Sequence, residues 1–588
     1  MKSPPILIAP RPARAISRGA GVVAILLALI AGGDFAHAQP AASLHAEIDR
    51  LVEHRWTGQG VVPAAVCDDA EFVRRAHLDL TGMVPTASEV RAFLGDPSSD
   101  KRQRLVDQLL ARPDYAVHMA RVFDVMLIER RIPTISSYDV PSPTWRGYLT
   151  QAFAENRPWD RIVREILESD GTGDVNAAGV KFALVRDAGP HLLTRDVGRL
   201  FLGIDLQCAQ CHDDPRIETY KQADYYGIYA FLQRVTSFRD SKKNVSLLGE
   251  TAAGKATFVS VFTAKSGETN PRLPGGEMVA DPMIEAGKEY VTKPGPNDRG
   301  VPAYSRRKKL AELLPRAETH GFSRNIVNRV WAQLMGRGLV HPLDLHHPDN
   351  PPSHPELLAR MESWFVEQKF DIKTLMREIM QSRAYQRSSI LPEGVQESPV
   401  DGFAAAKLRG LSPEQFAWSL LQATGRVEEH VARWEAQQKA KSKPATNSPT
   451  PPADKPMEAT PVWKARLVQL DALDRQARTL SAVFAGLPGQ PDGDFQPVVD
   501  QALHLLNSPA ILALVKDAPL LSRLSEIDTP EPVAEELYLS LLSRRPDAEE
   551  VAAVRSVIEA AKTAKERRDA LQPLVWGLLL SAEFRLNH

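Results

Sequence analysis

The stretch 194-TRDVGRLFLGIDLQCAQCH-212 carries the pattern from which both the fold and the chemistry of this chain are predicted. Its apolar residues recur at the three- and four-residue spacing of one helix face: Val197, Leu200, Phe201 and Ile204. Thr194 precedes this stripe and is of a residue type that favours a helix N-cap. We therefore predict a helix with one buried face that leads into the cysteine pair.

The same stretch ends in C-x-x-C-H, formed by Cys208, Cys211 and His212. This is the covalent attachment signature of c-type haem. Two thiols three positions apart can reach the two vinyl groups of one porphyrin, and the adjacent histidine can supply the proximal nitrogen ligand of the iron. The motif predicts haem c, with Cys208 and Cys211 as tethers and His212 as the proximal ligand.

Other interpretations of the cysteine pair stay open. Cys208 and Cys211 could form a short disulfide, structural or redox-active, if the chain is in an oxidising compartment. A zinc site would need a third and a fourth ligand, and the sequence has no second C-x-x-C. The two thiols could also be inert. Cys67, the third cysteine of the chain, is predicted to be an unpaired thiol without a role.

The sixth iron ligand is not determined by the pattern. Candidates for a distal ligand are His191, His118 and Met119, and a five-coordinate iron is equally compatible with the sequence. Aromatic residues follow the motif and could form an apolar shell that raises the reduction potential, or could simply be core residues: Tyr220, Tyr225, Tyr226, Tyr229 and Phe231. Asp213 and Asp214 are expected at the rim, where negative charge favours oxidised iron.

Helical periodicity covers most of the chain. Residues 42–234 are predicted to be an N-terminal helical domain that carries the motif, with a capping box at Thr86 and Glu89. Over 257–263, Thr and Val at every second position alternate with Phe258, Ser260 and Phe262, as strand residues do, and with nearby Pro and Gly they predict a β-rich insert at 235–300. Residues 301–588 are predicted to be a second helical domain. The expected fold class is mainly α and multi-helical, with a small β-rich insert between two helical regions.

Two segments are predicted to lie outside the packed structure. Residues 436–461 are rich in Lys, Ala, Ser, Thr and Pro, a composition that predicts a flexible insertion. Residues 1–38 combine four basic residues, an apolar stretch from about residue 19 to residue 33 and the small-x-small sequence Ala36-His37-Ala38. They predict a signal peptide cut before Gln39 and a periplasmic or secreted protein without a transmembrane span in the mature chain, although a retained N-terminal anchor is the alternative.

Charge and motif content exclude several function classes. Lys and Arg total 72 and Asp and Glu total 73, so no basic field points to a nucleic-acid partner. The sequence has no G-x-S-x-G, no H-E-x-x-H and no nucleotide-binding glycine loop, so no catalytic motif is recognisable and enzyme activity is left uncertain. The stretch 341–354 concentrates His and Asp, which could hold a metal or could belong to a polar surface loop.

Longer strings resemble a bacterial family. CDDAEFVRR at 67–75, LDLTGMVPT at 78–86 and FLGIDLQCAQCHD at 201–213 resemble the planctomycete cytochrome-c-like domain of unknown function. NRVWAQLMGRGLV at 328–340, NPPSHPELL at 350–358, SRAYQ at 382–386 and SAEF at 581–584 resemble the companion domain of unknown function that usually follows it. The resemblance covers nearly the whole chain after the predicted signal peptide.

The resemblance implies functional candidates only at Cys208, Cys211 and His212. It also implies an exported sulfatase-like partner, because the genes of this family often occur with such proteins. The chain departs from the family at Asp214, where a second histidine is usual, at Leu580, where an asparagine is usual, and at His346-His347. Because Asp214 stands where the family usually has its second histidine, this chain would lack any ligand or proton relay that the histidine provides.

Three functions follow as hypotheses. The leading one is an exported c-type-haem-like protein for periplasmic electron transfer or redox support of a partner enzyme. The second is a non-haem periplasmic binding or assembly protein braced by a Cys208–Cys211 disulfide. The third, which rests on gene context alone, is an exported polysaccharide-active enzyme.

Overall fold

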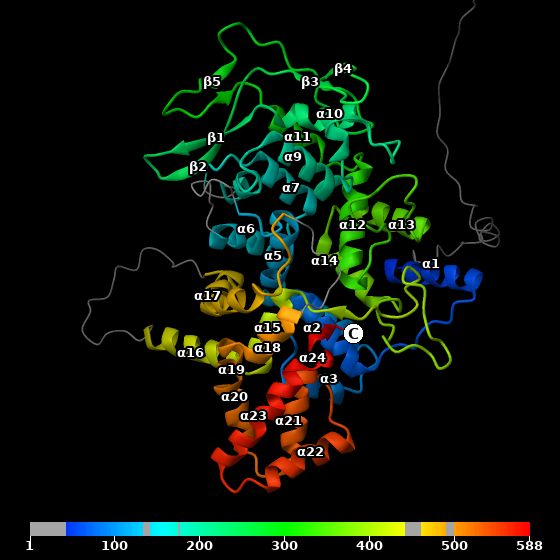
Figure 1. Ribbon diagram of the computed structural model, residues 1–588, viewed down its shortest axis with the longest axis vertical. Coiled ribbons are helices and arrows are strands. Elements are labelled where there is room, and N and C mark those ends of the chain that lie inside the picture. Colours follow the sequence, from blue (N-terminus) through cyan, green and yellow to red (C-terminus); the bar gives the residue numbers. More distant parts are fainter. Residues whose placement is uncertain (1–42, 133–141, 174–176, 442–459, 490–498, 588) are drawn as a thin grey trace, which may run out of the picture. The chain divides into compact units, whose positions relative to one another are not determined.

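The computed structural model describes residues 43–132, 142–173, 177–441, 460–489 and 499–587, and these are mainly helical (Figure 1). Strands in the described residues form four small two-stranded antiparallel sheets. The predicted fold class, multi-helical with small β elements, is therefore confirmed. The predicted signal peptide at 1–38 lies outside the described residues.

The first helical region contains ten α-helices and three short helical turns within the described residues. They are α1 (Leu44–Gln59), α2 (Asp69–Thr81), α3 (Ala87–Gly95), α4 (Lys101–Ala111), α5 (Pro113–Ile128), α6 (Ser142–Ala154), α7 (Trp159–Glu168), η2 (Ala177–Val180), α8 (Lys181–Leu184), α9 (Pro190–Val197), η3 (Gly198–Leu202), η4 (Cys208–Gln210) and α10 (Gln222–Leu232).

Local sequence explains how several of these helices begin. The capping box predicted at Thr86 and Glu89 is present: the Thr86 side chain accepts from the Glu89 N–H, and Glu89 accepts from the Thr86 N–H. The N-cap predicted at Thr194 is wrong. Helix α9 begins four residues earlier at Pro190, whose fixed φ suits a first helical position, and the Thr194 hydroxyl donates to the Pro190 carbonyl instead.

Strands β1 to β6 lie between the two helical regions. Antiparallel pairs are β1 (Val235–Asp240) with β2 (Val245–Glu250), β3 (Ala256–Val259) with β4 (Ser266–Thr269), and β5 (Tyr290–Thr292) with β6 (Val301–Pro302). The strand predicted over 257–263 is shorter than expected. It ends at Val259 because the chain turns there, with the Ser260 N–H donating to the Lys265 carbonyl.

The second helical region follows β6. It consists of α11 (Arg306–Leu313), α12 (His320–Met335), α13 (Pro355–Glu367), α14 (Ile372–Gln381), α15 (Pro413–Ala423), α16 (Arg426–Lys441), α17 (Val462–Ser481), α18 (Val499–Asn507), α19 (Pro509–Lys516), α20 (Pro519–Ser525), α21 (Pro530–Leu542), α22 (Ala548–Glu559), α23 (Ala564–Leu580) and α24 (Ala582–Arg585), with β7 (Arg409–Gly410) paired to β8 (Leu586–Asn587).

Helix α16 corrects part of the predicted flexible insertion. It continues to Lys441 and so includes residues 436–441, which were expected to be flexible. These six residues are Ala, Gln and Lys, all strong helix formers that can extend an existing helix without burying apolar surface. The predicted insertion from 442 to 459 lies outside the described residues.

In the described part of the chain, the buried apolar residues form two clusters, and each takes residues from both sides of residue 300. The first cluster takes residues from both sides of residue 300, from Leu44 to Ala404, together with Leu539. The second takes residues from Leu411 to Phe584 and adds Leu78, Met83, Val84 and Val117 from the first helical region. Each cluster is therefore completed by residues from both helical regions.

Buried polar contacts join the end of the chain to α2. The Arg74 guanidinium is completely buried and donates to the Phe584 carbonyl at 2.7 Å. Asp79, also on α2, accepts from Asn587 at 2.9 Å and from the Tyr385 hydroxyl at 2.9 Å. Because buried charges are costly without partners, these contacts fix the C-terminal residues on the N-terminal region. Among the described residues, no helix is both long enough and apolar enough to cross a membrane.

Candidate functional site

The C-x-x-C-H motif forms a short 3-10 turn that begins at Cys208 and is followed directly by Cys211 and His212. Both thiols are exposed, and neither is bonded to the other. Cys67 is the buried free thiol that the sequence predicts, 3% exposed in the first core cluster. The disulfide required by the second hypothesis is thus not formed in this structure.

Helix α10 and the β3–β4 hairpin hold the turn from two sides. The Gln222 amide donates to the carbonyls of Gln210 and Val259, at 3.3 and 3.2 Å. The Val261 N–H, in the hairpin loop, donates to the Cys211 carbonyl at 3.0 Å. These bonds satisfy the backbone of the turn and leave its thiol side chains at the surface.

His212 has one ring nitrogen in use. Its Nδ1 lies 2.6 Å from the Asp213 carbonyl oxygen. A carbonyl only accepts, so Nδ1 carries the proton, and the Nε2 of the neutral ring is left as an acceptor. No hydrogen bond to Nε2 is found among the described residues. This is the tautomer that a metal-binding histidine needs, because a backbone carbonyl commonly orients the ring from the nitrogen that does not bind the metal.

Aromatic rings form a continuous wall beside the turn, which we call the aromatic wall: Tyr225, Tyr226 and Tyr229 of α10 and Phe258 of β3. Ring centroids are 5.2 Å apart for Tyr225 and Tyr226, 5.4 Å for Tyr226 and Tyr229, and 4.8 Å for Tyr226 and Phe258. Cys211 lies close enough to Tyr225 and Tyr226 to add to the effect of burial in raising the pKa of both hydroxyls.

The hairpin loop adds exposed apolar side chains next to the motif. Phe262 is 74% exposed and packs against the His212 ring at 4.3 Å between centroids. Val259 and Val261 are 58% and 66% exposed. A group of exposed apolar residues around two free thiols is the kind of surface that marks a binding site.

His191 is the distal candidate that the structure brings to this wall. It lies on α9, its Nδ1 is 2.8 Å from the Tyr225 hydroxyl, and its ring stacks on Tyr229 at 4.6 Å. Partial burial lowers the pKa of its imidazole, so the ring is neutral at neutral pH. Helix α9 packs against α10, which also contacts the C-x-x-C-H turn.

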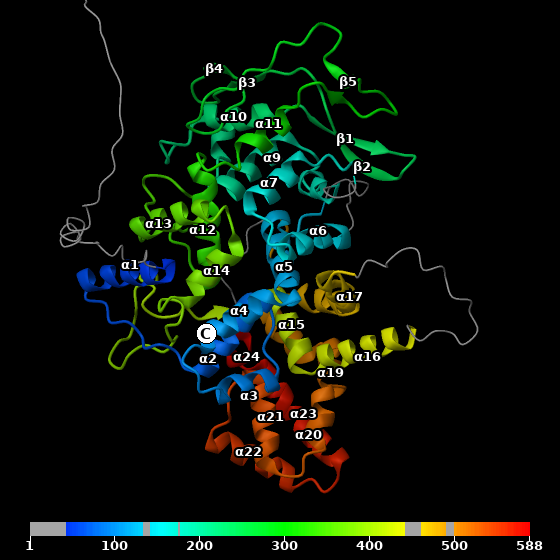
Figure 2. The same ribbon diagram turned by 180° about the vertical axis from the view of Figure 1, so that it is seen from behind.

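The structure does not bring His118 and Met119 to the turn. Both lie buried on α5, which packs against α2, α4, α6 and α17, and α5 is separate from α10 in both views (Figure 1, Figure 2). The Met119 sulfur contacts the Gln333 amide at 3.9 Å. The His118 ring fills the space beside Gly82, and a Cβ at position 82 would lie 2.2 Å from its Nδ1. These two residues act as core residues here.

The acidity of the first thiol bears on the redox-active alternative. Partial burial raises the pKa of Cys208, and the carboxylates of Asp214 and Asp205 raise it further. Redox-active C-x-x-C pairs instead depend on a lowered thiol pKa that supplies the thiolate. The electrostatics of the turn therefore do not favour a thiol–disulfide exchange site.

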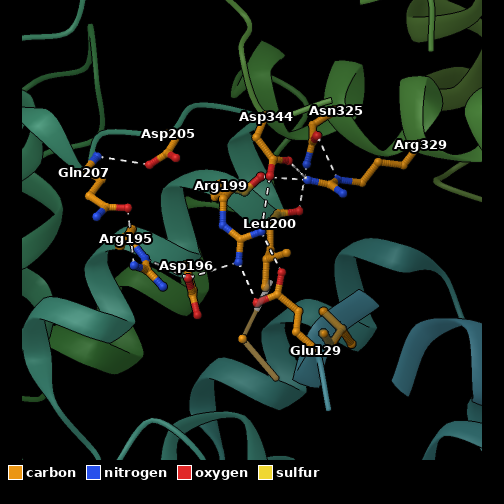
Figure 3. Close-up of polar contacts among 12 residues, drawn as sticks. Glu129, Arg195, Asp196, Arg199, Leu200, Asp205, Gln207, Asn325, Arg329 and Asp344 are labelled. Atoms are coloured by element: carbon orange, nitrogen blue, oxygen red, sulfur yellow. Dashed lines mark hydrogen bonds and ion pairs between the residues drawn. The ribbon is translucent and has the colours of Figure 1, made fainter. Parts of the chain in front are cut away.

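A buried ionic network fixes the segment that leads into the turn (Figure 3). Arg199, in η3, contacts Glu129 at 2.6 Å, Asp196 at 3.2 Å and Asp344 at 3.2 Å. Arg329 of α12 binds Asp344 and donates to the Arg199 carbonyl at 3.0 Å. Through Arg329 and Asp344, the network joins α12 to η3, α9 and the end of α5.

This network continues to the residue before the motif. The Arg195 guanidinium reaches the Gln207 side chain at 3.4 Å, and the Gln207 N–H donates to the Asp205 carboxylate at 3.0 Å (Figure 3). The Asp205 N–H donates to the Asp344 carbonyl at 2.9 Å. A rigid support of this kind places the adjacent turn with little freedom.

Asp344 and the backbone of His346 connect the histidine-rich stretch 341–354 to this network. The described residues contain no group of three or more His, Cys, Asp or Glu side chains arranged to hold a metal ion. Asp344 is occupied by Arg199 and Arg329, and the His346 backbone N–H donates to the Gly203 carbonyl at 3.0 Å. The metal alternative for this stretch is therefore not supported by its geometry.

Sequence reasoning missed the part of the site that comes from the hairpin. Phe258 and Phe262 were assigned to a strand, and nothing local showed that this strand folds back onto α10 and the motif. Arg195 was also missed. The available indication was the tyrosine series at Tyr225, Tyr226 and Tyr229, whose spacing places aromatic rings on one helix.

Fold and site together define a mainly helical protein with an exposed, unbonded C-x-x-C-H turn beside an aromatic wall. Residues 47–237 match the family model PSCyt2, described as "Protein of unknown function (DUF1549)". Residues 306–558 match the model PSD1, described as "Protein of unknown function (DUF1553)". The two matches occur in this order along the chain. Comparison with curated proteins and with solved structures finds no match.

Proposed function

We propose that this protein is an exported c-type-haem protein that carries single electrons for a redox or enzyme partner in the periplasm. The observation that carries the proposal is the geometry of the turn: two exposed free thiols, an adjacent histidine with a free Nε2, and an apolar aromatic surface next to them. The residues present therefore fit a covalently held porphyrin.

Covalent attachment of haem requires both thiols to be free, as Cys208 and Cys211 are in this structure. Each thiol adds across one vinyl double bond, with sulfur bonding to one vinyl carbon and the thiol hydrogen going to the other. No atom leaves and no oxidant is consumed. A Cys208–Cys211 disulfide would block both additions, so the free thiols support attachment through these two residues.

The surrounding residues have defined tasks in this proposal. His212 would bind the iron through Nε2 while the Asp213 carbonyl orients its ring. The aromatic wall and Phe262 would cover the porphyrin and limit water access. Bound haem supplies a one-electron couple between ferric and ferrous iron, and a redox protein or enzyme of the same compartment would give or take that electron. Asp213 and Asp214 would favour the ferric state through their charge.

Among the three distal candidates, we propose His191. It lies on the aromatic wall, its Nδ1 is hydrogen-bonded to the Tyr225 hydroxyl, and its other ring nitrogen has no hydrogen bond among the described residues.

Replacing His191 by alanine should shift the visible spectrum of the haem protein from a six-coordinate to a five-coordinate form. An unchanged spectrum would remove His191 from the site, and His54→Ala serves as the matched control because His54 is an exposed histidine on α1.

Haem staining of denaturing gels tests the attachment itself. The protein is produced in a host that attaches haem c in its periplasm, as wild type, as the Cys208→Ala/Cys211→Ala double variant and as Cys67→Ala. Wild type and Cys67→Ala should retain haem after denaturation, whereas the double variant should lose it. Equal staining of the double variant, or a colourless wild type, would contradict the proposal.

The location and the partner are proposed on weaker grounds. Export rests on the composition of residues 1–38, and an exported sulfatase-like protein is the partner that the family resemblance implies. N-terminal sequencing of the protein recovered from the periplasm should begin at Gln39. Recovery with an intact residue 1–38 segment would instead show a retained anchor.

A further inference from the structure

A cavity lies where α2 and the loop after it meet α15, α16 and α17. Its volume is about 160 Å³. At about 10–15 Å³ per water molecule, this is room for on the order of ten waters or for one small organic molecule. The walls come from both family-matched segments, with His77 on one side and Gln422 on the other.

His77 lines the cavity without a hydrogen-bond partner. It is 2% exposed, and neither Nδ1 nor Nε2 has a partner among the described residues. Burial lowers the pKa of its imidazole to about 4, with Glu89 and Asp114 opposing this effect and Arg112 adding to it. At neutral pH the ring is therefore neutral and offers one N–H donor and one nitrogen acceptor.

Gln422, on α15, is a second neutral polar group in the cavity wall. It is 9% exposed as a whole residue, and its side-chain amide, unlike the His77 ring, is not among the fully buried polar groups that lack a partner in the described part of the chain. Buried polar groups are nearly always hydrogen-bonded in folded proteins. The buried His77 ring, unpaired at both nitrogens in the cavity wall, points to a ligand that supplies its missing bonds, and the Gln422 amide can bind the same ligand.

The charged side chains that line the cavity are already in ion pairs, with one another or with residues outside the cavity. Arg112 binds Glu89 at 2.5 Å. Arg466 binds Asp114 at 2.8 Å, and Glu428 at the rim pairs with Arg523 at 3.2 Å. A charged ligand would have to break one of these pairs, whereas an uncharged ligand needs only the neutral His77 ring and the Gln422 amide.

We propose that this cavity binds a small uncharged compound with several hydroxyl groups. A hydroxyl both donates and accepts, as the neutral His77 ring and the Gln422 amide require. The C–H surface of such a compound would contact Val427 and Val431, which also line the cavity. The site is separate from the C-x-x-C-H turn, so it does not depend on haem attachment.

Titration calorimetry of the full mature chain tests the proposal with five probes. Glycerol, sorbitol and glucose are the uncharged probes, and gluconate and glucosamine are charged analogues of similar size. We expect saturable binding of at least one uncharged probe, and at least about tenfold weaker binding of both charged analogues. If no uncharged probe binds, the cavity holds water only and the proposal is overturned, as it is if the charged analogues bind equally well.

Variants locate the binding. Gln422→Leu keeps the size of the side chain and removes its amide, and should weaken binding about tenfold, the effect of one lost hydrogen bond. His77→Phe should weaken it at least as much. Gln333→Leu makes the same change as Gln422→Leu on α12, outside the cavity, and should leave binding unchanged. Unaltered affinity in a folded Gln422→Leu variant would overturn the assignment of the site.

Discussion

At the scale of single residues, the ionic network depends on carboxylates that have lost their contact with water. Asp196 and Arg186 have fully buried side chains and are 2.6 Å apart. Burial alone would raise the pKa of Asp196, but Arg186, Arg199 and Arg131 together hold this pKa well below its usual range. Asp196 is therefore ionised at neutral pH, and it compensates several buried guanidinium groups at once.

Asp196→Asn should lower the free energy of unfolding by about 3–5 kcal/mol, because removing one member of a buried ion pair leaves the other charge uncompensated. Urea unfolding followed by circular dichroism measures the effect. Asp349→Asn is the control. Because Asp349 is 73% exposed, this substitution should change the free energy of unfolding by no more than about 0.5 kcal/mol. Equal stabilities of the two variants would contradict the role assigned to the network.

His346 gives the stability a dependence on pH. Burial lowers its pKa to about 4, and Arg329 and Arg324 act in the same direction. The unfolded chain, whose histidines titrate near 6.5, therefore takes up this proton first as the pH falls. The contribution of His346 is complete above pH 6.5 and declines as the pH drops towards 4.

The slope of stability against pH between 6.5 and 4 should be smaller in His346→Gln than in wild type by up to about 1.4 kcal/mol per pH unit, the effect of one proton. Urea unfolding at pH 7, 6 and 5 shows this difference. The exposed His54 provides a control as His54→Gln, which should retain the wild-type slope. Parallel curves for His346→Gln and wild type would show that this imidazole is not buried in neutral form.

At the scale of elements, short-range sequence patterns predicted what adjacent residues decide. The capping box at Thr86 and Glu89 and the cysteine pair of C-x-x-C-H each span only two intervening positions, so both were found. The cap at Thr194 failed because Pro190 starts α9 earlier. The aromatic wall was predicted only in part, because Phe258 reaches α10 through a hairpin whose fold-back is a non-local contact.

Two helix ends provide a matched test of packing. Gly60 after α1 and Gly82 after α2 both have left-handed backbone, with φ of 65° and 72°. A Cβ at Gly60 would meet nothing within 4 Å, whereas one at Gly82 would collide with the His118 ring. Gly60→Ala should lower the free energy of unfolding by about 1 kcal/mol because of backbone strain. Gly82→Ala should lower it by about 1–3 kcal/mol more than Gly60→Ala does, because the added Cβ also collides with the His118 ring. Thermal unfolding of both variants measures this, and similar melting temperatures would contradict the observed packing of His118.

At the scale of the whole described chain, helical periodicity predicted two helical regions but not how they share their cores. Apolar periodicity shows that a helix has a buried face, and it does not show which partner covers that face. Here α1 packs against α13 and α14, and α7 packs against α11. The first core cluster is therefore built by residues on both sides of the β-rich segment.

Residues 43–300 expressed alone should not unfold cooperatively, because they lack the helices that complete the first core cluster. Differential scanning calorimetry should show a broad or absent transition for this fragment. Co-expression with residues 301–588 should restore a cooperative transition and co-purification of the two fragments. A sharp transition for 43–300 alone would show that the N-terminal region is an independent folding unit.

The central claim is that Cys208 and Cys211 hold haem covalently, and the intact mass of the protein tests it most directly. Protein from the periplasm of its own host, or of one that attaches haem c, is measured under denaturing conditions without reduction. The account predicts the mass of the chain plus one haem, with both thiols resistant to alkylation. A mass equal to that of the bare chain, with both thiols open to alkylation or joined in a disulfide, would contradict it.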